Sequence, residues 1–600
     1  MIVPMKKITL LSQDMHKDET LRVLQNAGLM HLCAQEVEAD PGVEQSEYHV
    51  QRLQQVLAAL DMNTGHAAPA QASSAWEIAS FVWDCLQRLR TIQDRRQALE
   101  QEQERIRPFG TFSPQSVQAL RDAGCEVKLY SLPGSQSVIP PREAVMIEIS
   151  ADRNARYVAL FSQKSVNLDA QEVPLPEQGL REIEDELSAL RTEREEVLQA
   201  ISECSVHRSQ MEDLLVQARD RSTYQRARAG MEIHADLAAV QGYLPARDLP
   251  SMQELAQKSG WGLHIQDPEP EDDPPTLIDV PQWVRPIKAV FSAINILPGY
   301  RETDISAPFL LFLSLFFAMI IGDAGYGALF LGITLAARRP LQRIHSHLVP
   351  FLLIMSGCTV VWGLLTGNIF GLSVHHPVLT NLQVEWLTGA QSDDRLMFLC
   401  FLIGALHLSL AHIWRLILLW PSPRVLAQIG WILITWGMFS AACTLVLFHH
   451  FPDVMILALG LGFILVVGFM RPLRELASQW TDFIRLPLDV ISQFVDVVSY
   501  VRLFAVGTAT VAVAQAFNQM ALSLGFEHVL SGLGAALILF LGHSMNIALA
   551  GMGVLVHGVR LNTLEFATHA GITWSGRAYQ PFAQNHTRSG GSRAVGEKRT

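Results

Sequence analysis

Two arginines lie inside strongly apolar stretches near the C-terminal end of the sequence. Arg502 lies in DVISQFVDVVSYVRLFAVGTATVAV, residues 489–513, and Arg560 lies in the apolar stretch 533–564. A charged side chain at the centre of a bilayer costs about 2.5–3.5 kcal/mol on insertion scales. Such a residue is retained when it snorkels, pairs or serves an ion pathway. Two arginines on neighbouring apolar segments, with other polar residues beside them, favour ion handling.

Polar residues accompany Arg502 on its own segment. At about 100° per residue, one helix face carries Asp489, Gln493, Asp496 and Tyr500. We expect the acidic part of this face to line a wet cavity open to the cytoplasm; the plainer alternative is that the acids cap the helix start. Arg502 is six residues beyond Asp496 and points about 120° away, so we expect it to face a protein partner or water.

The segment around Arg560 has a polar stripe of its own. His543, Asn546 and His557 share a helix face, and Gln515 adds a polar group on the preceding segment. This stripe predicts a second access path, although a single buried histidine is more often a hydrogen-bonded core residue. The sequence has no GxxxxGK[ST] nucleotide-binding loop and no mid-span carboxylate without charged neighbours. We therefore expect both ATP chemistry and the ion-carrying carboxylate on other proteins.

Eight predicted membrane spans position these residues. A span needs about 20 apolar residues, and GDAGYG at 322–327 divides the first long stretch into two short helices. Gly363, Gly367 and Gly371 are expected to let helix backbones approach closely, and Asp323 is expected to cap a helix or pair. The spans are expected near 306–321, 324–338, 349–371, 396–419, 426–448, 454–470, 487–521 and 531–563.

Charge in the connections sets the orientation, because basic residues collect on the cytoplasmic side. If both termini are cytoplasmic, eight spans place every basic cluster inside, whereas merging the first two would place the clusters outside. The opposite connections are mainly acidic. The basic clusters are Arg338, Arg339 and Arg343; Arg415 and Arg424; and Arg471, Arg474 and Arg485.

The two halves of the 600-residue sequence differ in charge. Residues 1–300 carry 29 of the 46 Lys and Arg and 44 of the 58 Asp and Glu, a net charge of −15, while residues 301–600 have a net charge of +3. No region is basic enough to suggest nucleic acid. The start, MIVPMKKITLL, does not resemble a signal peptide, so we expect a cytoplasmic first half. The seven cysteines are scattered, without CxxC, which argues against a metal site or disulfide framework.

We expect the first half to be a cytoplasmic α+β arm over 1–266. Its proximal lobe is predicted from 1–40 and 235–266, and its distal lobe from 111–172, with a Pro-rich linker at 267–305. An antiparallel helical hairpin, about 44–108 and 177–221, joins the lobes because apolar residues recur there at helical spacing. An ordinary helical bundle is the alternative. The membrane domain is predicted at 306–566, and the tail 583–600 is expected to be disordered.

Several short motifs occur in order along the chain. They are MKKITLL with GLMHL at 28–32, GYLP at 242–245, IGDAGYG, GLLTGNIFG, SYVRLFAVG around Arg502 and HGVRLNTLEF around Arg560. Together they resemble the membrane stator of V/A-type rotary ATPases, called subunit I in bacteria and archaea and subunit a in eukaryotes. The resemblance covers nearly the whole chain.

The resemblance implies two half-channels that carry H⁺ or Na⁺ to and from carboxylates on a rotating ring. Arg502 and Arg560 match the family's arginines at the ring interface. The implied partners are the proteolipid c/K ring, peripheral-stalk subunits E and G, central-stalk and head subunits, and the lipid bilayer, in a multi-pass protein of the bacterial inner (plasma) membrane. No cofactor is implied. The half-channel candidates are Asp489, Gln493, Asp496, Gln515, His543, Asn546, His557 and Glu565.

The sequence departs from the family pattern at two places. Thr510 stands where several eukaryotic members have histidine, and Ala550 stands where they have glutamate, so those roles do not transfer. Two rival functions stay open. A secondary ion transporter would need a substrate site at broken, repeated helices, and a membrane-anchored scaffold would leave both arginines unexplained.

Overall fold

A computed structural model describes the chain except for residues 34–39, 63–73, 134–141, 153–154, 165, 177, 374–381, 389–390, 471–480 and 585–600. The predicted disordered tail therefore lies outside the described residues from 585 onward, as do Arg471 and Arg474. The chain divides into two compact units. One consists of 1–8, 243–252 and 265–580; the other consists of 9–242, 253–264 and 581–600.

A five-stranded sheet is built from strands at both ends of the first half of the chain. Its order is β2-β8-β1-β9, with β7 paired to β8. The strands are β1 (Met5–Gln13), β2 (His31–Leu32), β7 (Glu232–His234), β8 (Leu237–Pro245) and β9 (Gly262–Gln266), and the accompanying helices are α1 (Lys17–Ala27) and α7 (Leu249–Ser259). Glycine is required at Gly242, because a Cβ there would lie 2.4 Å from the His31 carbonyl oxygen.

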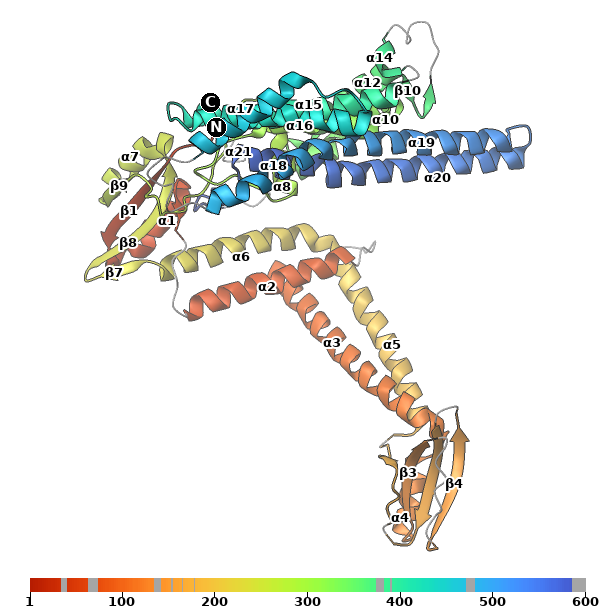
Figure 1. Cartoon of the computed structure of the whole chain (residues 1–600). Coiled ribbons are helices and arrows are strands. Elements are labelled where there is room, and N and C mark those ends of the chain that lie inside the picture. Colours follow the sequence, from red (N-terminus) through yellow and green to blue (C-terminus); the bar gives the residue numbers. More distant parts are fainter. Residues whose placement is uncertain are drawn as a thin grey trace. The chain divides into compact units, whose positions relative to one another are not determined.

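Four long helices occupy the predicted hairpin. In Figure 1, α2 (Pro41–Met62) lies beside α6 (Arg208–Ala229), and α3 (Ala75–Ile106) lies beside α5 (Leu180–Glu203). Their facing sides bury apolar residues, and ion pairs from Arg88 to Glu193 and from Arg95 to Glu186 join α3 to α5. The predicted domain boundaries stay predictions.

A separate four-stranded antiparallel sheet follows α3. Its order is β4-β5-β3-β6, and α4 (Pro114–Asp122) precedes it. The strands are β3 (Glu126–Pro133), β4 (Ala144–Ala151), β5 (Ala155–Ser162) and β6 (Gln171–Val173). Tyr130, Leu132, Val158 and Leu160 form a buried cluster on this sheet.

Apolar helices dominate the second half of the chain. Within the described residues, five helices are long and apolar enough to cross a membrane: 348–366, 392–419, 425–447, 484–524 and 529–570. Three shorter apolar helices are α9 (Ser306–Ile321), α10 (Ala324–Ala336) and α17 (Asp453–Phe469). These elements correspond to the eight predicted spans, but length and composition alone support five, so eight stays a prediction.

The remaining elements of this half are mostly helical. They are η5 (Arg285–Ile287), α8 (Lys288–Ala293), α11 (Arg338–Ile344), α12 (Leu348–Thr366), β10 (Asn368–Ile369), β11 (Leu372–Ser373), α14 (Glu385–Thr388), α15 (Ser392–Leu419), α16 (Val425–Leu447), α18 (Thr481–Ser499), α19 (Val501–Leu524), α20 (Val529–Gly553), two π-helices (Val554–Gly558 and Leu561–Phe566) and α21 (Ala567–Ala570). A common core joins α9, α15, α16, α18, α19 and α20.

The GDAGYG break is fixed by Asp323. Its buried carboxylate accepts hydrogen bonds from the backbone N–H groups of Gly325, Tyr326, Phe370 and Gly371. The prediction that this residue caps a helix is confirmed. The carboxylate also ties the start of α10 to the turn after α12, and four charge-assisted bonds compensate its burial.

Small residues allow the closest helix contacts, as predicted. A Cβ at Gly363 would lie 2.0 Å from the Ala324 nitrogen, and a Cβ at Gly371 would lie 2.6 Å from the Ala514 Cβ. Gly367 instead ends α12 in the left-handed conformation, with φ +74°. Such approaches are typical of packed membrane helices.

Candidate functional site

Arg502 and Arg560 share one carboxylate. Arg502 Nη2 donates to Glu565 Oε1 at 2.6 Å, and Arg560 Nε lies 3.7 Å from the same oxygen. The Glu565 side chain is 6% exposed, against 22% for Arg502 and 55% for Arg560. The group carries two positive charges and one negative charge, so a net charge of +1 remains, and most of its exposed surface belongs to Arg560.

Local backbone irregularities produce this arrangement. The α18 helix ends at Ser499 and α19 begins at Val501, and Arg502 Nε donates to the Ser499 carbonyl oxygen at 2.9 Å. Arg560 and Glu565 are five residues apart, a spacing that an α-helix places on different sides. The π-helix at Leu561–Phe566 has i→i+5 hydrogen bonding, which brings residues five apart toward the same side. π-turns of this kind occur often at functional sites.

The structure gives Arg502 a contact that the sequence did not predict. We expected this residue to face a protein partner or water, because the acids of its own segment point elsewhere, and that expectation stays a prediction. Glu565 supplies a partner within the chain, 63 residues along the sequence. This contact depends on how two helices pack together. The angular spacing of residues along one helix does not predict that packing.

The acidic face of α18 is only partly open. Asp489 is exposed, but Gln493 is fully buried and its Nε2 donates to Thr435 Oγ1 on α16 at 2.5 Å. Asp496 is partly buried, and its Oδ2 lies 2.9 Å from His569 Nε2. Gln493 therefore faces the protein interior, and its place in a half-channel stays a prediction. It shares the helix side that packs into the protein.

A second polar cluster adjoins the Asp496–His569 pair. The His412 ring lies 5.1 Å from the His569 ring, and His412 Nδ1 is hydrogen-bonded to Gln428 Oε1 at 3.0 Å. His412 Nε2 is buried without a hydrogen-bond partner among the described residues. Neither histidine was a sequence candidate, because each lies far along the chain from Asp496.

His543 and Asn546 belong to a network that joins α10, α19 and α20. Asn546 Nδ2 donates to the Tyr326 hydroxyl at 3.0 Å and to the Thr510 carbonyl at 2.8 Å. The Tyr326 hydroxyl is then left to donate to His543 Nδ1 at 2.6 Å, and His543 Nε2–H donates to Asn518 Oδ1 at 3.1 Å. Both ring nitrogens are satisfied in the neutral form, an arrangement suited to holding the helices together.

His557 lies near the arginine pair. Electrostatic interactions link it to Arg502 and Arg560, and its buried Nδ1 has no hydrogen-bond partner among the described residues. The stripe predicted on this segment is thus divided. His543 and Asn546 form the network above, and His557 lies with the charged group.

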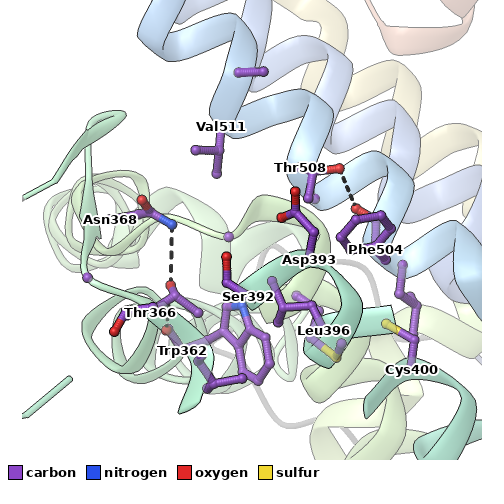
Figure 2. Close-up of a pocket in the computed structure, with 18 of the residues that line it drawn as sticks. Trp362, Thr366, Asn368, Ser392, Asp393, Leu396, Cys400, Phe504, Thr508 and Val511 are labelled. Carbon is purple, nitrogen blue, oxygen red and sulfur yellow. Dashed lines mark hydrogen bonds between the residues drawn. The ribbon is translucent and has the colours of Figure 1, made fainter. Parts of the chain in front are cut away.

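A cavity of about 580 Å³ lies beside α19. Figure 2 shows Trp362 and Thr366 of α12, Ser392, Asp393 and Leu396 of α15, and Thr508 and Val511 of α19 among its walls. Its further lining residues include Asn368, Gln383, Thr388 and Gln515. Of the sequence candidates, Gln515 lines this cavity, which has hydroxyl, amide and carboxylate groups suited to water and ions.

No family model matches the chain, but it is similar to curated proteins described as subunit I of V-type or A-type ATP synthases. "V-type ATP synthase subunit I 1" of Treponema pallidum is 30% identical, and the match covers 97% of this chain and 100% of that protein. The chain belongs to the V-type ATP synthase subunit I family. "V-type ATP synthase subunit I" of Borreliella burgdorferi is 29% identical over 97% of this chain and 99% of its own length.

A more distant subunit I matches over a shorter range. The "A-type ATP synthase subunit I" of Methanocaldococcus jannaschii is 24% identical over 68% of this chain and 64% of its own length. A crystal structure of "the cytoplasmic N-terminal domain of subunit I, homolog of subunit a, of V-ATPase" covers 43% of this chain and 99% of that chain at 14% identity, with a TM-score of 0.21. That superposition is too poor to support an argument about the fold.

Several polar residues of this subunit I chain had no signal in the sequence. His569, His412, Tyr326, Asn518 and Asp393 reach their partners or the cavity through contacts between distant segments. No group of three or more His, Cys, Asp or Glu suited to a metal ion occurs among the described residues. The clusters found here are therefore hydrogen-bonded pairs and networks.

Proposed function

We propose that this subunit I chain is the stator of a rotary V/A-type ATPase or ATP synthase. It carries H⁺ or Na⁺ through two half-channels to and from the carboxylates of a rotating proteolipid c/K ring. The chain is non-catalytic toward ATP, which other subunits hydrolyse or make.

The observation that carries this proposal is the carboxylate that two arginines share within apolar helices. Glu565 neutralises one charge and leaves a net charge of +1, with Arg560 the more exposed of the two arginines. A positive group at a protein surface favours the ionised form of a carboxylate brought against it. A passing ring carboxylate would therefore release its ion there. Apolar side chains exposed along α20 fit a lipid-embedded partner: Leu537, Phe540, Leu541, Leu549 and Met552.

The ion path would use different residues on the two sides. The cavity that Gln515 and Asp393 line supports an access path from the outer side. Asp489 and Asp496 support the cytoplasmic path, with His569 beside Asp496. His557 adjoins the arginines between these paths. Gln493, His543 and Asn546 instead stabilise helix packing through their hydrogen bonds.

The topology of the proposal has eight spans, with both termini in the cytoplasm and the protein in a bacterial inner membrane. The five long apolar helices and three shorter ones support this count together with the basic connections. The α+β arm would anchor peripheral-stalk subunits E and G, and the membrane half would contact the ring and the lipid. The long α3–α5 pair, joined by ion pairs, suits a part that resists torque.

The rival functions explain fewer of these features. In the described residues the polar groups form distributed pairs and networks, whereas a secondary transporter needs a substrate site formed by broken helices in corresponding positions of two repeats. A scaffold gives no reason to hold two arginines on one carboxylate inside apolar helices.

The test is Arg502→Ala in the complete complex, reconstituted into vesicles. ATP-driven ion uptake should fall to background while the complex still assembles, because removing Arg502 takes the net charge of the group from +1 to zero. Arg339→Ala, which alters an exposed arginine of α11, is the matched control and should pump normally. Coupled pumping retained by Arg502→Ala would refute the proposal.

A further inference from the structure

His407 of α15 is held on both faces and at one edge. It is fully buried, and its ring stacks 3.9 Å from the Phe312 ring and 4.4 Å from the Phe566 ring. Its Nδ1 lies 2.7 Å from the Tyr500 hydroxyl. An imidazole confined in this way has one orientation, so it can fix the position of whatever it contacts.

Two of these contacts lead directly to the arginine–glutamate group. Phe566 follows Glu565 in the chain, so its stacking on His407 places the end of the π-helix that carries Glu565. Tyr500 lies at the break between α18 and α19, two residues before Arg502. His407 therefore contacts Phe566, which adjoins Glu565, and Tyr500, which lies two residues before Arg502.

The Tyr500 ring has a shaped socket on α15. Gly404, one turn before His407, would place a Cβ only 2.7 Å from the Tyr500 ring, so glycine leaves the space that this ring fills. Tyr500 is itself fully buried. Gly404 leaves space for the Tyr500 ring because it has no side chain, and His407 forms a hydrogen bond with the Tyr500 hydroxyl.

The helix break at Tyr500 also positions the Arg502 side chain. Arg502 Nε donates to the carbonyl oxygen of Ser499, the residue before Tyr500. A shift of the tyrosine would move this carbonyl and with it the second anchor of the guanidinium. The orientation of Arg502 thus depends on Tyr500 through the backbone and on Glu565 through the ion pair.

We infer that His407 is a positioning residue for the Arg502–Glu565 pair. Through Tyr500 and Phe566 it sets the separation of the guanidinium and the carboxylate, although it touches neither charged group. This inference rests on the proposed function of the pair. It concerns His407, which is not among the ion-path residues assigned above.

The test compares His407→Phe and Tyr500→Phe in the complete complex reconstituted into vesicles. Each variant keeps an aromatic ring and deletes the same hydrogen bond. Ions pumped per ATP hydrolysed, normalised to assembled complex, should fall about fivefold, the change expected when one net hydrogen bond no longer favours the competent geometry. The double variant should be no worse than either single one, because both changes remove one interaction.

A passive leak measurement separates positioning from mere packing. With ATP absent and an imposed ion gradient, both single variants should leak faster than the wild type, because a misplaced pair no longer separates the half-channels. Additive losses in the double variant, wild-type coupling in either single variant, or loss of assembly in both would overturn the inference. Arg502→Ala, measured alongside, distinguishes failure of the proposed function from failure of the role inferred for His407. If it pumps normally the proposed function fails, and if it alone uncouples the complex only the role of His407 fails.

Discussion

Replacing Glu565 by glutamine removes the negative charge that Arg502 and Arg560 share while keeping the side-chain volume. The carboxylate is nearly buried and lies 2.6 Å from one arginine and 3.7 Å from the other. Removing one partner of a buried ion pair typically costs about 3–5 kcal/mol. Arg560 is largely exposed, so its part of that cost is screened by solvent and the estimate belongs mainly to Arg502.

The variant should slow ion pumping more than it harms assembly. Without Glu565, both arginine charges act on a passing ring carboxylate and bind it more tightly, so its release becomes slower. If about 1.4 kcal/mol of the lost pairing free energy is added to the barrier for releasing the ring carboxylate, turnover falls about tenfold. The assay is ATP-driven ion uptake by the complete complex in vesicles, with assembly checked on the same preparation.

A conservative change gives the control for this reasoning. Glu565→Asp keeps the charge at a shorter reach, so it should retain more pumping than Glu565→Gln. Equal pumping by Glu565→Gln and the wild type, in assembled complexes, would refute the claim that the shared carboxylate tunes the stator charge. Equal loss in both variants would show that geometry outweighs charge at this position.

Three further outcomes are expected. Asp496→Asn should slow pumping and shift its pH dependence, and an unchanged pH profile would contradict a role in the cytoplasmic path. Gly363→Ala forces a Cβ to 2.0 Å from a backbone nitrogen of α10, so it should destabilise the protein by roughly 1–3 kcal/mol. Gly357→Ala on the same helix meets nothing within 4 Å and should melt no lower than the wild type, because alanine favours a helix over glycine. The hydrogen bond from Lys7 lowers the pKa of Asp272; its stabilisation is present above the unfolded pKa of about 3.9 and is lost as pH falls through the folded value. Melting temperatures of Lys7→Met and the wild type should therefore converge toward acidic pH, and a constant difference would exclude this linkage.

The sequence predicted the local features well because their causes are local. Asp323 was expected to cap a helix on account of the Gly-rich break around it, and its carboxylate accepts four backbone hydrogen bonds. Gly363 was expected to permit close packing, and it does. The apolar segments were placed within a few residues of the helices, because hydrophobic length is a strong signal.

The sequence did not predict which side chains contact Gln493 and Arg502. Helix periodicity places Gln493 and Asp489 on one side of α18 but does not say which of the two meets α16. The sequence did not predict the contact between Arg502 and Glu565, because Glu565 lies on a different helix and its position depends on the π-helix that contains it. The sequence does not show where i→i+5 bonding will replace i→i+4. Such irregular turns form when tertiary contacts outweigh local preference.

The charge count of the site limits what it can do. Arginine stays protonated throughout the physiological range, so Arg502 and Arg560 cannot relay protons themselves. The Glu565 Oε1 atom is engaged by both arginines, so this carboxylate serves as their shared counter-charge. In the proposed function the group would remain fixed while a carboxylate on another subunit gains and loses the ion, and Asp496 with His569 would supply polar groups for the cytoplasmic path.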